Sequence, residues 1–295
     1  MRERITIAVG IDDSWSANGA VDWALYESGL SAASIRVLHV VGDRPPAGLF
    51  HDGRGATEAG KRLVADVREY LDHRDSKGLH TAVVLSGTPA HILAQSTGND
   101  RMLVVGRHGR RMLGRLLIGS TAEAVAYGAE TAVVVVPPKW SPGDRDAPIV
   151  VGVDELEYCE SAVDFAVGLA AERRAPVRLV HIWDIPTMFT GDEPDTAGTA
   201  ETARRYYGDR LDATVRRCCD KYPGVSIEAE LRRGHPVAGL TDAGREAGAQ
   251  MLVVGGRSHR RMMALLLGGT ARGILQHATG PTAIVHQPGT RPAQT

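Results

Sequence analysis

The sequence contains the same segment twice. Residues 102–121 and 251–270 both begin Met-Leu-Val-Val-Gly, continue through a basic stretch, and reach a second glycine after a run of leucines. The offset between Gly106 and Gly255 is 149 residues, about half of the 295-residue chain. Solenoid repeats are shorter, with periods of roughly 20–50 residues. The pattern therefore predicts a duplicated domain.

The join between the two copies is polar and proline-rich, as expected of a short, stiff linker. We expect a first domain over residues 1–138, a linker over 139–147, and a second domain over 148–295. Each half is long enough to bury a core of its own.

Both halves alternate short β-branched runs with longer helical patterns, which is typical of right-handed βαβ units on a parallel sheet. The chain therefore belongs to the α/β class, with helices on both faces of each sheet. Two long loops are expected, over Gly42–Gly60 and Asp184–Gly198. The expected strands are Ile5–Ile11, Ile35–Val41, His80–Leu85, Met102–Gly106 and Ala132–Val136, then Ile149–Val153, Val177–Ile182, Ser226–Leu231, Met251–Gly255 and Thr282–His286.

The charge balance argues against nucleic-acid and membrane partners. The chain carries 34 basic and 35 acidic residues, and therefore has no overall attraction for polyanions. No apolar run approaches the roughly 20 residues that span a bilayer, and the first residues lack the apolar region of a signal peptide. The 3 cysteines show no metal-ligand spacing. We expect a cytoplasmic protein with reduced thiols.

Two segments of the first half are expected to meet at the carboxyl edge of its sheet, where open α/β sheets bind ligands. One contains Gly10, Asp12 and Asp13 and follows the first strand. The other contains Gly106 and Gly109, then nine residues (110–118), then Gly119-Ser120-Thr121 at a helix start.

These residue types suit a phosphate. Glycines allow the backbone to approach phosphate oxygens, and amides at a helix start favour an anion. The hydroxyl of Ser120 could add a donor. The carboxylate of Asp12 could accept from an adenine amino group or a ribose hydroxyl, or hold a metal such as Mg²⁺. The alternative is that the glycines serve only turns and close packing.

Together these residues resemble the universal stress protein family in its tandem form, over nearly the whole chain. The resemblance rests on the Gly-Ile-Asp-Asp-Ser start, the Gly-Thr-Pro turn, the glycine-spaced loop and the Ala-Val-Val-Val-Val-Pro strand. It implies two doubly wound, five-stranded parallel sheets of order 3-2-1-4-5, as in adenine nucleotide alpha hydrolases. It also implies pairing of the domains through their last strands, and ATP or another adenine nucleotide as ligand.

The resemblance also implies roles for individual residues. Asp12 would meet the nucleoside, and Val40 or Val41 would line the adenine pocket. Apart from the resemblance, Arg107 and His108 are basic residues between the loop glycines and could contact the phosphates, with a solvated loop face as the alternative. The glycines Gly106 and Gly109 would face the phosphates, while Gly119, Ser120 and Thr121 would hold phosphate and ribose.

The second half departs from this pattern. Ser258 replaces Gly109, and Gly269 replaces Ser120, which removes a hydroxyl donor. A hydrogen bond to a charged group is worth roughly 1.5–3 kcal/mol. We therefore expect the second half to bind more weakly, through Asp154, Gly255, Gly268 and Thr270, although a working second site remains an alternative.

Several functions remain open from the residues alone. The loop lacks the Gly-Lys-Ser/Thr of a P-loop ATPase, and no catalytic triad is apparent, so at most slow ATP hydrolysis is expected. The alternatives are binding of AMP or a cyclic nucleotide, or an interaction protein that binds no nucleotide. A homodimer and an unidentified regulatory partner are also expected. His39 and His181 occupy matching strand ends, where packing or hydrogen bonding is the simplest role.

Overall fold

The structure, a computed structural model, describes residues 5–42, 53–75, 78–108, 118–154, 156–184, 196–256 and 268–287. The strands are β1 (Thr6–Ile11), β2 (Ser34–Val41), β3 (Thr81–Ser86), β4 (Met102–Gly106), β5 (Ala132–Val136), β6 (Ile149–Val153), β7 (Val177–Trp183), β8 (Ile227–Arg233), β9 (Met251–Gly255) and β10 (Thr282–Val285). The helices are α1 (Trp15–Asn18), α2 (Ala20–Ser31), α3 (Gly53–Arg74), α4 (Pro89–Gln95), α5 (Ser120–Gly128), α6 (Leu156–Arg173), α7 (Thr196–Lys221), α8 (Pro236–Glu246) and α9 (Gly269–His277).

The strands form one continuous ten-stranded sheet in the order β3-β2-β1-β4-β5-β10-β9-β6-β7-β8. Within each half the strands are parallel and follow the predicted order 3-2-1-4-5. The predicted fold class is therefore confirmed.

The two halves join through an antiparallel pair, β5 with β10, in which Val134 lies opposite Ala283. The prediction that the last strands pair is thus confirmed. Unpaired, these apolar strands would each present an open sheet edge, and the pairing removes both edges. The strand sequence AVVVV is buried along its whole length, because helices cover both faces.

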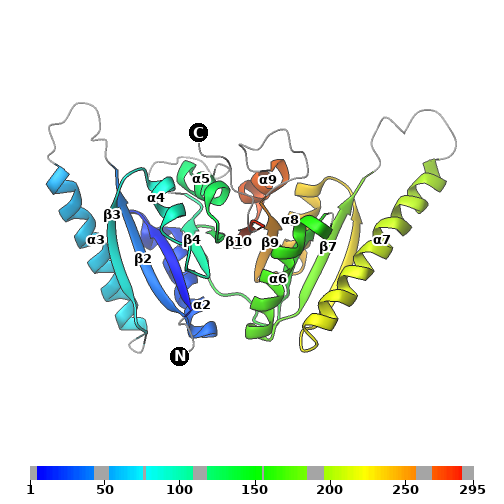
Figure 1. Ribbon diagram of the computed structural model, residues 1–295, viewed down its shortest axis with the longest axis horizontal. Coiled ribbons are helices and arrows are strands. Elements are labelled where there is room, and N and C mark those ends of the chain that lie inside the picture. Colours follow the sequence, from blue (N-terminus) through cyan, green and yellow to red (C-terminus); the bar gives the residue numbers. More distant parts are fainter. Residues whose placement is uncertain are drawn as a thin grey trace.

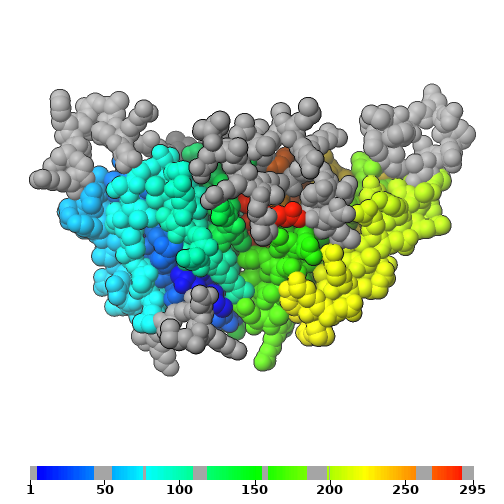
Figure 2. All heavy atoms as spheres, in the orientation of Figure 1, coloured from blue at the N-terminus to red at the C-terminus, as the bar shows by residue number. Residues whose placement is uncertain are grey.

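Helices cover the sheet in two layers. One core lies between the sheet and α2, α3, α6 and α7, and the other lies between the sheet and α4, α5, α8 and α9. In Figure 1, α3 and α7 lie on opposite outer flanks, whereas α5 and α9 are near the centre of the molecule. In the space-filling view, the early residues in blue and cyan and the later residues in yellow occupy opposite sides of the face shown (Figure 2).

Two expected loops are shorter than predicted. The expected loop Gly42–Gly60 ends early because α3 begins at Gly53, and the expected loop Asp184–Gly198 ends where α7 begins at Thr196. Several glycines in 53–60 obscured the helical pattern in the first case. Gly60 is buried against the sheet, where an added Cβ would lie 2.9 Å from the His39 ring. The middles of both expected loops lie outside the described residues.

Candidate functional site

The turn after β1 is organised by Asp12. Its Oδ1 accepts a hydrogen bond from the backbone N–H of Ser14 at 2.9 Å and a second from the Ser14 hydroxyl. The Asp12 carbonyl accepts from the amide of Trp15 at 3.1 Å, which starts α1. The carboxylate is thereby fixed at the carboxyl end of the central strand. Asp13 follows in the same turn and is exposed.

Gly10 is the next-to-last residue of β1 and Gly106 is the last residue of β4, and both have packing reasons to be glycine. A Cβ on Gly106 would lie 2.7 Å from Cβ and Cγ of Asn18. A Cβ on Gly10 would lie 3.1 Å from a methyl group of Leu93. Asn18 is buried, and its Oδ1 accepts from the amide of Ala20 at 3.1 Å. These two glycines are therefore explained by close packing, and the case for a phosphate site depends on other residues.

The loop between β4 and α5 is closed at its base by backbone hydrogen bonds. The Arg107 amide donates to the Val136 carbonyl at 2.8 Å, and the Gly119 amide donates to the Arg107 carbonyl at 2.8 Å. Gly109 and its neighbours up to residue 117 lie outside the described residues. The two ends of the glycine-spaced loop are thus held together.

The start of α5 is open. Gly119 is its N-cap and supplies no side-chain oxygen, while Ser120 and Thr121 are exposed in the first turn. The first amides of a helix have no partner within the helix and favour an anion. Ser120 is exposed at this same end, so its hydroxyl and the first amides of α5 are hydrogen-bond donors at one place.

The side chain of Arg107 points to the other domain. Arg107 is 7% exposed, and its guanidinium donates to the carbonyl of Ala278, which follows α9. Burial lowers the pKa of this guanidinium from its ordinary value. This side chain therefore serves the domain junction, and a phosphate contact by Arg107 stays a prediction. His108, the next residue, is half-buried.

The two valines at the end of β2 face opposite sides of the sheet, as alternation along a strand requires. Val40 is buried in the core beneath α4 and α5, the layer that contains the α5 start. Val41 lies on the other face, where its Cγ2 is close to Gly60 of α3. Of the two predicted residues, Val40 is therefore the one on the same side as Ser120.

The second domain repeats this edge in altered form. Asp154 is exposed after β6, and Gly268 precedes α9, whose second residue, Thr270, is also exposed. The closing hydrogen bond from the Gly268 amide to the Gly256 carbonyl is 3.5 Å long, against 2.8 Å in the first domain. Gly255 ends β9 as Gly106 ends β4. The edge is retained, but its loop closes less tightly.

The junction between the domains is asymmetric. Gly256 stands where the first domain has Arg107, and His286 occupies the space: a Cβ on Gly256 would lie 2.0 Å from the His286 ring. His286 Nε2 donates to the carbonyl of Ala126 in α5 at 2.8 Å, since a carbonyl can only accept. Arg272 of α9 pairs with Glu123 of α5 at 2.7 Å. Helices α5 and α9, which begin at the two proposed edges, are thus each bonded to the opposite domain.

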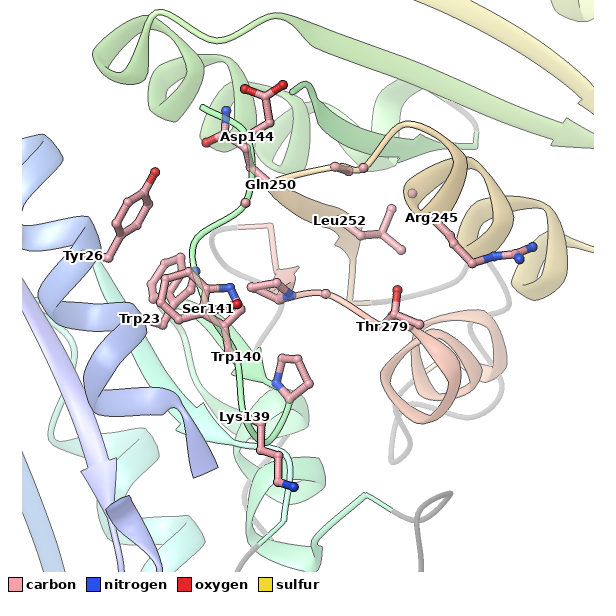
Figure 3. Close-up of a pocket in the computed structure, with 18 of the residues that line it drawn as sticks. Trp23, Tyr26, Lys139, Trp140, Ser141, Asp144, Arg245, Gln250, Leu252 and Thr279 are labelled. Carbon is pink, nitrogen blue, oxygen red and sulfur yellow. The ribbon is translucent and has the colours of Figure 1, made fainter. Parts of the chain in front are cut away.

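A cavity of about 340 Å³ lies at the same junction, beside the linker. Figure 3 shows that Trp23 and Tyr26 come from α2, Trp140 from the linker, and Arg245 from α8. Ala278, which accepts from Arg107, also lines this cavity. The sequence gave no indication that Asn18 packs on Gly106, that His286 binds α5, or that Arg107 donates to Ala278, because none of these contacts belongs to a sequence motif.

Two absences can be stated for the described part of the chain. None of its helices combines the length and apolar character needed to cross a membrane. Among the same residues there is no group of 3 or more His, Cys, Asp or Glu side chains placed to hold a metal ion.

The fold and this edge together define a class: a tandem α/β protein in which each doubly wound half presents a glycine-capped helix start at the carboxyl edge of its strands. The family model described as "Universal stress protein family" matches residues 3–137 and again residues 147–286. The chain therefore belongs to the universal stress protein family, in its tandem form.

Several relatives extend over almost the whole chain. A universal stress protein of Mycolicibacterium smegmatis is 29% identical over 297 residues, covering 95% of this chain and 96% of the relative. A universal stress protein of Mycobacterium tuberculosis is 26% identical over 296 residues, covering 95% and 96%. The crystal structure of a universal stress protein from Archaeoglobus fulgidus matches with a TM-score of 0.71 at 15% identity, covering 95% of this chain and 98% of that one, which supports the fold.

Proposed function

We propose that this chain is an ATP-binding regulatory protein of the stress response, with nucleotide held mainly in the first domain. The observation that carries the proposal is the start of α5, where the Gly119 amide donates to the Arg107 carbonyl and Ser120 is exposed in the first turn, beside the first amides of the helix. A polyphosphate is the anion that such an end favours within an α/β edge of this kind.

The remaining contacts follow from the placement of the other residues. Asp12 is fixed at the switch point between β1 and β4 and can accept from a ribose hydroxyl or an adenine amino group. Val40 lies on the α4 and α5 side of the sheet and can pack against the base. Gly106, Thr121 and, outside the described residues, Gly109 complete the proposed phosphate contacts, with Gly10, Asp13 and His108 at its edge.

The second domain is proposed to bind more weakly, through Asp154, Gly255, Gly268 and Thr270. Its helix starts with Gly269 in place of Ser120, so the hydroxyl donor is lost. The lost hydrogen bond alone corresponds to roughly a tenfold to hundredfold weaker affinity.

Magnesium fits the first site only as a companion of the nucleotide. Mg²⁺ is usually held by one or two carboxylates together with phosphate oxygens, and Asp12 supplies one carboxylate. ATP hydrolysis is the alternative function, and it would be slow because the loop sequence lacks the lysine of a P-loop. AMP or a cyclic nucleotide in the same site, and an interaction protein that binds none, complete the alternatives.

The first experiment is mass spectrometry of the nucleotide that copurifies with the full chain, which separates ATP from AMP and cyclic nucleotides. The second is a thermal scan with and without Mg-ATP. Nucleotide at 100 times its dissociation constant stabilises the fold by about 2.7 kcal/mol. An unchanged midpoint at millimolar Mg-ATP, with nothing copurified, contradicts the proposal. Phosphate release above that of an Asp12→Ala variant would favour the slow ATPase.

A matched pair of variants locates the site. Ser120→Ala and Gly269→Ala both place alanine first in a helix, one in each domain, and a Cβ on Gly269 meets no atom within 4 Å. Loss of affinity is expected only for Ser120→Ala. Equal losses would place binding in both domains, contrary to the proposed asymmetry.

We further propose that the protein acts in the cytoplasm, as its ordinary charge balance and reduced-type cysteine usage favour. Homodimerisation of the chain and a regulatory partner protein are part of the same proposal. Size-exclusion chromatography with light scattering, with and without ATP, tests the dimer.

A further inference from the structure

The two ends of the ten-stranded sheet differ in chemistry. Strand β3 ends the sheet in the first domain, toward the flank that carries α3 (Figure 1), and β8 ends it in the second. Among the described strands β3 pairs only with β2, so the backbone N–H and C=O groups on its outer side have no strand partner. An edge of this kind is a template for pairing with another chain.

The edge at β3 is uncharged and exposes apolar side chains. Val83 is 37% exposed, and Leu79, shortly before the strand, is 61% exposed. Alternation along the strand places Val83 and the exposed Thr81 on the same face as Leu85, which packs on the core under α4 and α5. The strand sequence TAVVLS contains no charged residue. The β3 edge therefore joins open backbone groups to an apolar surface.

The second domain carries charges at the equivalent positions. The Gly-Thr-Pro turn after β3 and the Gly-His-Pro turn after β8 align with an offset of 147 residues. Val83 then corresponds to Glu230, and Thr81 corresponds to Glu228. The same face of the edge strand is thus apolar or neutral in one domain and acidic in the other.

The charges of β8 are held within their own domain. Glu228 pairs with Arg178 of β7 at 3.3 Å. Arg232 pairs with Glu230 beside it and with Glu246 of α8 at 2.7 Å. Charged side chains on an edge strand are a device that prevents pairing with another chain, because the pairing would remove them from water. Strand β8 has this protection, and β3 lacks it.

A second copy of this chain fits the β3 edge. The chain already closes apolar edges by antiparallel pairing of equivalent strands, since β5 pairs with β10. Antiparallel pairing of β3 with its own copy, about a twofold axis at Val83, places Thr81 opposite Leu85 and Ala82 opposite Val84, so that the side chains of each face match. No charged residue of the strand enters the pairing, and a partner selected by charge finds none on β3 to bind.

We propose that two copies of this chain dock through the β3 edge, by antiparallel pairing of β3 with β3 of the second copy, so that one sheet continues across both. This inference rests on the homodimer proposed above and names its interface. It does not depend on the nucleotide site, because Val83 belongs to none of the contacts proposed for ATP.

Light scattering after size-exclusion chromatography of the full chain tests the interface. The informative variant is Val83→Glu, which installs the residue of the second domain at an exposed position and sets two carboxylates opposite each other at the axis. We expect the mass of two chains for the native protein, and a dissociation constant of the dimer raised by about tenfold or more in the variant. The matched control Glu230→Gln, at the other edge, should remain a dimer. Unchanged ATP affinity in titration calorimetry shows that Val83→Glu is folded.

A cross-linking measurement covers a Val83→Glu variant that fails to fold. Directly opposed residues of an antiparallel pair have Cα atoms about 4.5–5.5 Å apart, within the range that a disulfide spans. Val83→Cys, in a chain whose exposed Cys219 is replaced by Ser, should therefore form a disulfide-linked dimer when diamide is added as oxidant. Glu230→Cys in the same background should form little.

Each result decides between the proposals. A native chain that is monomeric but binds ATP overturns this inference and the homodimer, and it leaves the nucleotide site standing. A dimer that Val83→Glu leaves intact keeps the homodimer and overturns the β3 interface. Equal disulfide formation by Val83→Cys and Glu230→Cys overturns the interface as well.

Discussion

The ion pair between Glu27 and Arg173 gives the sharpest stability prediction, because it lies at the junction of the two domains. Glu27 belongs to α2 and Arg173 to α6, and their side chains are 1% and 3% exposed. Nη2 of Arg173 donates to the Glu27 carboxylate, and Nη1 donates to Oε1 of Gln250 at 3.2 Å. Oε1 of Glu27 and Nε of Arg173 have no partner among the described residues.

We predict that Arg173→Met destabilises the protein by about 3–5 kcal/mol at neutral pH, because it leaves a buried carboxylate uncompensated. The double variant Glu27→Leu with Arg173→Met should recover most of this loss, since apolar replacement of a buried pair is often neutral or stabilising. The loss of stability comes from the unpaired buried charge that each single variant leaves. The stability changes of Glu27→Leu and Arg173→Met are therefore far from additive.

The pH dependence supplies an independent check. Burial raises the pKa of Glu27 above its ordinary value, with Arg173 acting in the opposite direction. A carboxyl group whose folded-state pKa is raised contributes most stability below its unfolded pKa, and this contribution falls as pH rises through the folded value. Arg173→Met removes the opposing charge and raises the pKa further. The variant should therefore recover stability on acidification relative to the native chain.

Urea unfolding followed by tryptophan fluorescence measures both effects, because the Arg173 guanidinium lies 6.0 Å from the ring centre of Trp23 at the junction. Titrations at pH 7 and pH 5 give the difference between native and variant chains. The reasoning is refuted if Arg173→Met costs less than about 1 kcal/mol at pH 7, or if its deficit grows on acidification.

Further predictions concern single residues. Gly106→Ala places a Cβ 2.7 Å from a buried side chain and should cost about 1–3 kcal/mol in thermal unfolding. Gly168→Ala, where a Cβ meets nothing within 4 Å in α6, should instead stabilise by about 0.5–1 kcal/mol; equal effects would refute the packing argument. Burial raises the pKa of the Cys159 thiol to about 11, so iodoacetamide at pH 8 should label exposed Cys219 and spare Cys159 by peptide mass spectrometry. Ser120→Ala should weaken ATP binding by roughly tenfold or more in titration calorimetry, and an unchanged affinity would remove Ser120 from the proposed site.

Much of the fold could be predicted from local sequence patterns. The predicted strands Met102–Gly106, Ala132–Val136, Ile149–Val153 and Met251–Gly255 match the observed bounds, because runs of valine and isoleucine form strands buried on both faces. The predicted hydrogen-bonding role of the two strand-end histidines was also confirmed. Nδ1 of His39 lies 3.0 Å from the carbonyl oxygen of Ile11, and Nδ1 of His181 lies 2.8 Å from that of Val153.

Predictions failed where distant residues decide. The expected loop Gly42–Gly60 gave way to α3 at Gly53, because packing against β2 outweighs the low helix propensity of its glycines. The side chain of Arg107, which was expected at a phosphate, donates to a carbonyl 171 positions away, a contact that no local pattern indicated; the phosphate contact itself stays a prediction. The glycine spacing of the loop is a local pattern, whereas the acceptor of the Arg107 side chain, the Ala278 carbonyl, belongs to the other domain.

The amino-acid sequence by itself determined the duplication, the α/β class and the departures of the second copy from the first, since each is written in residue order and spacing. Only the tertiary structure decided the register in which β5 and β10 pair, that Glu27 and Arg173 meet, and that ion pairs hold the charges of β8 whereas Val83 of β3 stays exposed. These features arise from contacts between segments far apart in the chain, where packing and charge compensation select partners that no local pattern encodes.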